Sequence, residues 1–171
     1  MTVLLANHIG INVPDIDAAF VWYRDVLGLN PYIEPGDALN DGSHFGKVVK
    51  DIFGSRFEEV RMAHLGLADG VGIELFQFKT PATEVPDESF EYWRSGIFHF
   101  CLTVDDPTSF AAHIAANGGK QLSKVWQLFG NKDYEVVYTQ DPWGTTIELC
   151  NRSYTTIWSN HVTPTLVEVK S

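Results

Sequence analysis

Two histidines and two glutamates recur at matching places in this sequence. His8 begins the segment His8-Ile-Gly-Ile-Asn-Val-Pro-Asp15, and His99 begins the similar segment His99-Phe-Cys-Leu-Thr-Val-Asp-Asp106. Glu74 and Glu148 each lie in an Ile-Glu-Leu triplet that follows an Asp/Gly turn. Imidazole and carboxylate groups suit a divalent first-row metal that keeps open positions for water or substrate. The pattern predicts a metal site with these four residues as ligands.

Alternation along the expected strands supports this hypothesis. Successive side chains of a strand point to opposite faces, so each of the four residues lies opposite an apolar face that must meet the helices. A single histidine or glutamate on a strand is usually structural. Four of them at repeat-equivalent positions are different, because two buried carboxylates are costly unless a cation compensates them. A pseudo-twofold axis between the halves would bring all four to one point.

The repeat also predicts how the chain is organised. Each half is typical of a module with one strand, one helix and three further strands. The first module is expected at residues 8–13, 15–28, near 32, 58–67 and 72–79. The second is expected at residues 99–104, 106–117, 121–128, 134–140 and 145–150. In both modules an aspartate before the helix is a suitable N-cap, and a glycine, Gly28 or Gly118, suits its end.

The two modules differ in length, and this sets the domain boundaries. The first module, 1–80, is longer and carries an insertion near 35–55, which starts as a loop and continues as an amphipathic helix at 44–53. A linker at 81–96 contains Pro81 and Pro86, and the second module spans 97–152. Residues 153–171 form a C-terminal extension that has no counterpart in the first half.

Composition excludes several classes of function. The chain has 171 residues, of which 44% are hydrophobic and 13% aromatic, which is typical of a globular domain. The net charge is −10 and no basic cluster is present, so we expect neither nucleic acid nor a membrane as partner. With no signal-peptide pattern and only two cysteines, the chain is expected to be cytoplasmic. Because there is no CxxC pair, we expect no thiolate zinc site, and Cys101 and Cys150 are expected to line the wall of the metal site.

These features together resemble the vicinal oxygen chelate superfamily, which includes glyoxalase I, methylmalonyl-CoA epimerase, fosfomycin-resistance proteins, bleomycin-resistance proteins and extradiol dioxygenases. The resemblance covers about residues 6–151. It implies an α+β fold in which two βαβββ modules form a curved mixed sheet. In glyoxalase I the metal ligands run His or Gln, Glu, His, Glu along the chain, and His8, Glu74, His99 and Glu148 fill these positions in order. The epimerase has Gln where this chain has Glu74.

The resemblance implies a metal-dependent lyase or isomerase of the glyoxalase type. Such an enzyme removes a proton next to a carbonyl while a divalent ion (Ni, Zn, Co, Mn or Fe) stabilises the enediolate. Glu148 is the expected base, and Glu74 is the alternative. We expect a small-molecule substrate and a homodimer. The alternatives are an extradiol-type dioxygenase acting on a catechol-like substrate, an epimerase-like enzyme, and a drug-binding resistance protein without catalysis.

A few other polar residues have simpler interpretations. Arg61 either meets an anionic substrate or forms a surface ion pair, and the ion pair is the commoner case. His64, His113 and His161 have no partner in the repeat and are expected to be structural.

Overall fold

The computed structural model describes residues 4–86 and 90–159. The chain divides into two compact units, Met1–Ser89 and Phe90–Ser171, which we describe one at a time. The division falls within residues 81–96. The finer domain boundaries, including an extension at 153–171, stay a prediction, and residues 160–171 of that extension lie outside the described residues.

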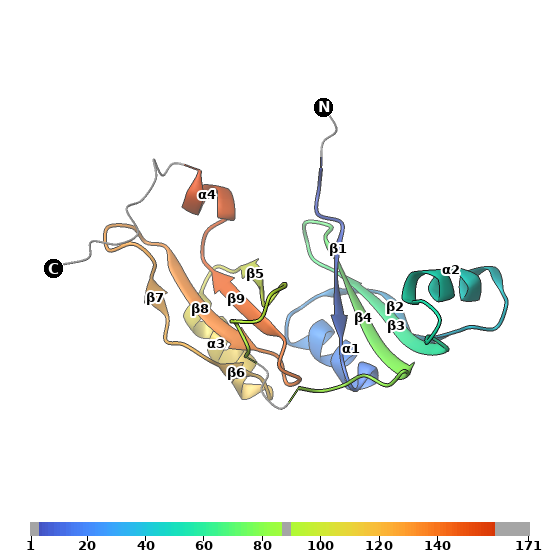
Figure 1. Cartoon of the computed structure of the whole chain (residues 1–171). Helices are drawn as coiled ribbons and strands as arrows, with labels where there is room; N and C mark the ends of the chain where they lie inside the picture. The colour runs from blue at the N-terminus through green and yellow to red at the C-terminus, as the bar shows by residue number, and fades with distance from the viewer. Residues whose placement is uncertain (1–3, 87–89, 160–171) are drawn as a thin grey trace. The chain divides into compact units, whose positions relative to one another are not determined.

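Unit 1 is a four-stranded mixed sheet with two helices (Figure 1). Its elements are β1 (His8–Asn12), α1 (Ile16–Asp25), β2 (Asn30–Leu39), α2 (His44–Phe53), β3 (Glu59–Gly66) and β4 (Gly72–Thr80). The strand order is β1-β4-β3-β2. β1 runs parallel to β4, and the other neighbours are antiparallel.

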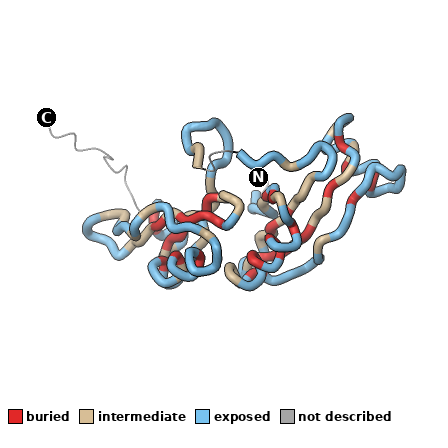
Figure 2. Tube along the Cα trace, turned by 90° about the horizontal axis from the view of Figure 1, so that it is seen from below, coloured by how far each residue is buried: buried red, intermediate tan, exposed pale blue. Residues whose placement is uncertain are grey.

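Helix α1 begins where the sequence predicts. The side chain of Asp15 accepts a hydrogen bond from the backbone N–H of Ala18 at 3.1 Å, which satisfies one of the free donors of the first turn. The inner face of the helix packs on the sheet, and the buried side chains include Ile16, Ala19, Phe20, Tyr23, Leu65, Ile73 and Leu75. Figure 2 shows these buried stretches of helix and strand in red. The helix ends at Asp25, and Gly28, with a φ of 72°, turns the chain toward β2.

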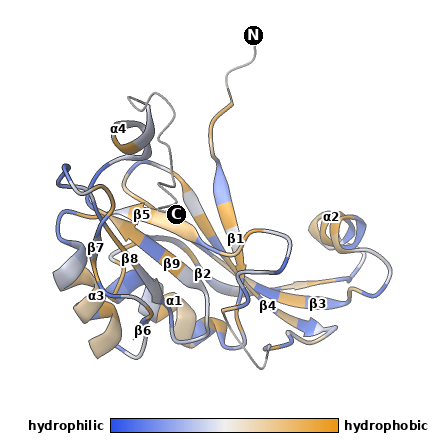
Figure 3. Ribbon diagram, turned by 60° about the vertical axis from the view of Figure 1, so that its left-hand side comes forward, coloured by the Kyte–Doolittle hydropathy of each residue, from blue (hydrophilic) through white to orange (hydrophobic). Residues whose placement is uncertain are grey.

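The insertion contains the expected helix, but its first part is a strand and not a loop. α2 spans His44–Phe53, as its amphipathic pattern predicts, and Figure 3 shows hydrophobic and hydrophilic residues on this helix. β2 continues through Pro35 to Leu39 because the ladder shifts register between Ile33 and Gly36. Proline has no N–H to donate, and an edge strand with a bulge tolerates this.

Unit 2 repeats the same architecture. Its elements are β5 (Phe100–Thr103), α3 (Pro107–Ala116), β6 (Lys120–Gln121), β7 (Trp126–Gln127), β8 (Glu135–Gln140), β9 (Thr146–Cys150) and α4 (Tyr154–Trp158). The strand order is β5-β9-β8-β6, and β7 also pairs with β8. β5 is parallel to β9. The α+β class and the duplicated module are therefore confirmed.

One expected strand of unit 2 is divided. In place of a continuous strand at 121–128, the structure has two short strands, β6 and β7. The backbone N–H groups of Leu122 and Ser123 both point to the carbonyl oxygen of Tyr138, and the hydroxyl of Ser123 accepts from the N–H of Tyr138. This doubled pairing interrupts the ladder as a bulge does.

The core of unit 2 lies between α3 and the sheet. Ala111 and Ile114 of α3 are fully buried, as are Val137, Ile147 and Leu149 of the strands. Among the described residues of both units, no helix is long and apolar enough to cross a membrane.

Candidate metal centre

In unit 1, His8 and Glu74 come together across the parallel strands β1 and β4. The Nε2 atom of His8 lies 3.3 Å from Oε2 of Glu74. Nδ1 of His8 lies 2.7 Å from Oδ1 of Asn7, so a proton on Nδ1 leaves the lone pair of Nε2 facing the glutamate. Gly72 is paired with His8, and a Cβ there would lie only 3.1 Å from the Cβ of His8. The glycine keeps room for the imidazole.

His64 also belongs to this cluster, which the sequence analysis missed. It lies opposite Glu74 in the β3–β4 ladder, and its Nδ1 is 3.4 Å from Oε1 of Glu74. His64 is therefore not remote from the site. The turn between β3 and β4 determines that His64 lies opposite Glu74. In this turn the N–H of Leu67 donates a hydrogen bond to the carbonyl of Val71, which sets the register of the two strands. A pocket of about 220 Å³ at this place is lined by Asn7, His8, Tyr32, His64, Gly72 and Glu74.

In unit 2, His99 and Glu148 form the equivalent pair. The Nε2 atom of His99 lies 3.1 Å from Oε2 of Glu148. The imidazole packs on the rings of Phe98 and Tyr138, with centroid distances of 4.3 and 5.3 Å. Its Nδ1 atom is buried and has no hydrogen-bond partner in the described part of the chain.

Tyr138 holds the position in unit 2 that His64 holds in unit 1. It lies opposite Glu148 in the β8–β9 ladder, as His64 lies opposite Glu74 in β3–β4. Burial and the charge of Glu148 raise the pKa of Tyr138 to about 12. The side chain is therefore a neutral phenol at neutral pH, and it can donate a hydrogen bond beside Glu148.

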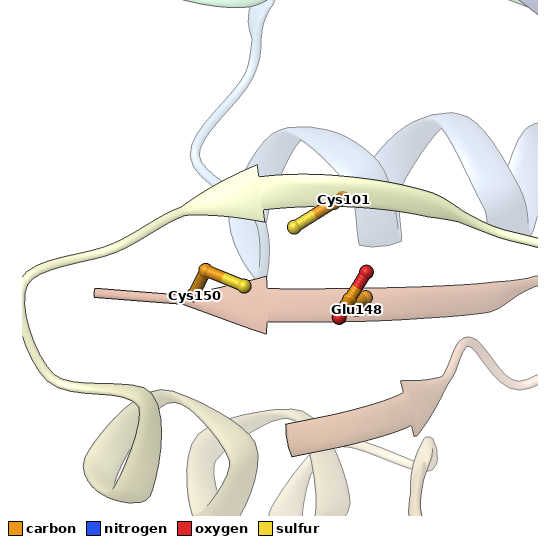
Figure 4. A group of neighbouring side chains, drawn as sticks. All are labelled: Cys101, Glu148 and Cys150. Atoms are coloured by element: carbon orange, nitrogen blue, oxygen red, sulfur yellow. The ribbon is translucent and has the colours of Figure 1, made fainter. Parts of the chain in front are cut away.

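The two cysteines lie next to the same glutamate. Cys101 is paired with Glu148 across β5 and β9, and Cys150 follows two residues later on β9. One ligand atom from each of these three residues lies within 4.8 Å of the others (Figure 4). The hydrogen bond to Cys150 and the charge of Glu148 raise the pKa of the Cys101 thiol. Both thiols are free.

The two His–Glu pairs have the spacing that a metal ion needs. Ligands about 2.1 Å from one ion, at octahedral or tetrahedral angles, are about 3.0–3.4 Å apart. The separations of 3.3 Å for His8–Glu74 and 3.1 Å for His99–Glu148 fall in this range. Each unit thus supplies one imidazole and one carboxylate that fit a divalent ion. The set of all four ligands on one ion stays a prediction.

Arg61 forms ion pairs instead of an open anion site. Its guanidinium lies 2.5 Å from Oδ2 of Asp17 and 3.4 Å from Oδ1 of Asp37. His113 contacts Asn117 on its own helix. His161 lies outside the described residues.

A duplicated βαβββ fold with one His–Glu pair in each repeat is the architecture of a vicinal oxygen chelate protein. The model of the Glyoxalase/Bleomycin resistance protein/Dioxygenase superfamily matches residues 5–149, and the chain belongs to this superfamily. Among curated proteins, none matches the chain significantly.

Solved structures agree on the fold. A glyoxalase family protein from Bacillus cereus is 26% identical, with a TM-score of 0.69, over 88% of this chain and 95% of that one. Glyoxalase I from Zea mays is 20% identical, with a TM-score of 0.59, over 86% of this chain and 44% of that one. A fosfomycin resistance protein from Listeria monocytogenes is 10% identical, with a TM-score of 0.57, over 94% of this chain and 100% of that one. The last two likenesses concern the fold alone.

Proposed function

We propose that this chain is a metal-dependent lyase or isomerase of the glyoxalase type, which acts on a small molecule that carries two neighbouring oxygens. The observation that carries the proposal is the repeat of one His–Glu pair in each unit, with separations of 3.3 and 3.1 Å. His8, Glu74, His99 and Glu148 would hold one divalent ion (Ni, Zn, Co, Mn or Fe). Membership of the superfamily supports this, because glyoxalase I has the same ligand order.

The residues of the chain have distinct tasks in this proposal. A divalent ion bound by the four ligands would polarise the two substrate oxygens and so acidify the neighbouring C–H bond. Glu148 removes that proton and returns it to the adjacent carbon, with Glu74 as the alternative base. Tyr138 lies opposite Glu148 in the ladder, and its neutral phenol donates a hydrogen bond to a substrate oxygen.

A second candidate is an extradiol-type dioxygenase acting on a catechol-like substrate. It is favoured by one specific contact, the 3.4 Å between Nδ1 of His64 and the second oxygen of Glu74. If this pairing keeps Glu74 off the metal, the ligands that remain are His8, His99 and Glu148. Two histidines and one carboxylate are the usual set for oxygen chemistry at Fe(II).

Two measurements distinguish these candidates. A proton-transfer enzyme incorporates deuterium from heavy water at the carbon next to the carbonyl, and it consumes no oxygen. An Fe(II)-loaded dioxygenase consumes oxygen with catechols and forms a ring-cleaved product. An epimerase-like enzyme would also exchange deuterium, but on a thioester substrate. A resistance protein without catalysis would bind a drug with neither activity.

The ligand assignment has its own test. We expect His99→Ala to remove most of the bound metal from a folded protein, since the imidazole is a direct ligand. His113→Ala is the matched control, because His113 is an exposed histidine on α3 that hydrogen-bonds to Asn117 at the end of the same helix. Metal content after dialysis, measured by atomic emission, decides the question. Wild-type occupancy in His99→Ala would show the ligand set to be wrong.

A further inference from the structure

A second group of ligand atoms lies in unit 2 and uses none of the residues of unit 1. It consists of the Sγ atoms of Cys101 and Cys150 and a carboxylate oxygen of Glu148, all within 4.8 Å of one another. Cys101 comes from β5, and the other two residues come from β9. In Figure 4 the two sulfur atoms project toward each other from neighbouring strands, with Glu148 beside them.

We propose that Cys101, Cys150 and Glu148 form a metal site for a thiophilic divalent ion such as Zn²⁺ or Cd²⁺. Metal–sulfur bonds of about 2.3 Å at tetrahedral angles place two sulfurs about 3.8 Å apart. The largest separation in the cluster, 4.8 Å at most, closes to this value with a small rotation of side chains that already share one face. A fourth position stays open to water.

The surroundings of the cluster suit such an ion better than a hard one. Sulfur ligands select soft and borderline metals, whereas the oxygen and nitrogen set of the proposed active site accepts harder ions. Each thiol loses its proton to solvent as the metal–sulfur bond forms, so one ion displaces two protons. The carboxylate of Glu148 supplies the third ligand. Two thiolates and one carboxylate hold a divalent ion with strong charge compensation.

The two sites share Glu148 and are otherwise independent. His8 and Glu74 take no part in the thiol site, so its existence does not rest on the proposed function. An ion at the thiol site would occupy the carboxylate that we propose as the base. The local spacing of the cysteines gives no hint of this site, because they are 49 positions apart in the sequence and strand pairing alone brings them together.

Cadmium titration of the full chain tests the site directly. The protein is fully reduced, its two free thiols per chain are counted, and all metal is removed before Cd²⁺ is added. We expect the ultraviolet thiolate-to-cadmium absorption band to saturate at one Cd²⁺ per chain. Cys101→Ser is the first variant, because Cys101 is exposed and its replacement leaves the core intact. It should weaken Cd²⁺ binding at least ~10-fold, as loss of a ligand does.

Further variants separate this site from the proposed active site. Cys150→Ser should have the same effect as Cys101→Ser. Glu148→Ala, which removes the carboxylate oxygen altogether, should retain the band but weaken binding at least ~10-fold. Thr103→Ala and His113→Ala are matched controls and should leave the titration unchanged, since neither residue belongs to the thiol site or to the proposed active site.

Four results would overturn the proposal. They are no band, unchanged Cd²⁺ affinity in Cys101→Ser, unchanged Cd²⁺ affinity in Glu148→Ala, and saturation at half an ion per chain. The last would mean that exposed Cys101 residues of two chains bridge one ion. A failed cadmium titration would leave the His99→Ala test of the proposed function untouched, because that test follows a different metal.

Discussion

Glu148 has more chemically distinct neighbours than any other proposed ligand. Nε2 of His99 lies 3.1 Å from its Oε2 atom, Tyr138 lies opposite it in the ladder, and two thiols lie beside it. Its position is set by β9, which follows a tight turn in which Asp141 accepts hydrogen bonds from the backbone N–H groups of Trp143 and Thr145. A carboxylate held this firmly suits a base that must return a proton to a defined carbon.

We expect Glu148→Gln to lower turnover at least ~100-fold, the low end for loss of a general base. The amide preserves the shape and still offers an oxygen to a metal, but it cannot accept a proton. Metal content should therefore stay largely unchanged. Glu74→Gln should be milder, and Glu34→Gln, which changes an exposed glutamate of β2, should have no effect. Near-normal turnover in Glu148→Gln would reject it as the sole base and favour Glu74 or the dioxygenase hypothesis.

The sequence predicts those residues of the candidate site that lie in local motifs, but not those that strand pairing brings close. His8, Glu74, His99 and Glu148 are found by the repeat, because each recurs in a short local motif. His64 and Tyr138 have no such motif, and their proximity to the glutamates depends on antiparallel register. Cys101 and Cys150 meet only through the parallel pairing of β5 with β9. Contacts set by pairing between strands are invisible to local spacing.

At the scale of elements, helix α3 depends on both of its ends. Asp106 caps the first turn, where its Oδ1 accepts from the N–H of Ser109 at 3.0 Å and its Oδ2 from the hydroxyl of Ser109 at 2.6 Å. At the other end, Gly118 has a φ of 88°, and the N–H of Gly119 donates to the carbonyl of Ile114. The chain then enters β6 directly. Both ends can be tested by substitution.

The cap at Asp106 predicts a dependence on acidic pH. The hydrogen bonds from Ser109 lower the pKa of Asp106 from its ordinary value of 3.8. A lowered pKa in the folded state means that the stabilisation is present above pH 3.8 and is lost as pH falls through the folded value. Asp106→Asn retains a good cap that does not titrate. Urea unfolding between pH 6 and 2 should show a smaller loss of stability in this variant, and identical curves would contradict the assignment.

Gly119 predicts a steric effect at the opposite end of α3. A Cβ at this position would lie 2.5 Å from the carbonyl oxygen of Gln140 and 2.6 Å from Cγ2 of Ile114. A shift of the Gln140 backbone would disturb the strand pairing and so cost free energy. Gly119→Ala should therefore destabilise the fold by about 1–3 kcal/mol. Gly130→Ala is the control, since a Cβ there meets no atom within 4 Å. Denaturant unfolding measures the stability of both variants. Equal stability would show that the backbone at Gly119 is not closely packed against Gln140 and Ile114.

Elements were predictable where their causes are local. The amphipathic pattern and the Ser43 cap define α2, and its expected range 44–53 is confirmed. The prediction of one continuous strand at 121–128 was wrong. The interruption is caused by hydrogen bonds to Tyr138, which lies on another strand, so the local sequence does not reveal it. The end of α1 was placed three residues too late, since Gly28 serves the turn after the helix and not its last residue.

At the scale of the whole molecule, both units present a parallel strand at an edge of their sheet. β1 and β5 stand at the ends of their strand orders. Unpaired edges of sheets are usually covered or paired, and a twofold partner does this with a single repeated contact. The segment before β1 adds apolar surface, because Leu4 and Leu5 are 88% and 85% exposed. These features favour association with a second copy of the chain.

We therefore predict a homodimer, with a mass by light scattering of twice the 19.2 kDa of one chain. Replacing both Leu4 and Leu5 by aspartate should weaken association at least ~10-fold, equivalent to about 1.4 kcal/mol, because a charge is poorly accommodated in an apolar contact. Val85→Asp is the control, since it places an aspartate at another exposed apolar position. A monomer throughout the micromolar range would contradict the prediction. In that case the four proposed ligands would have to meet through the two units of a single chain.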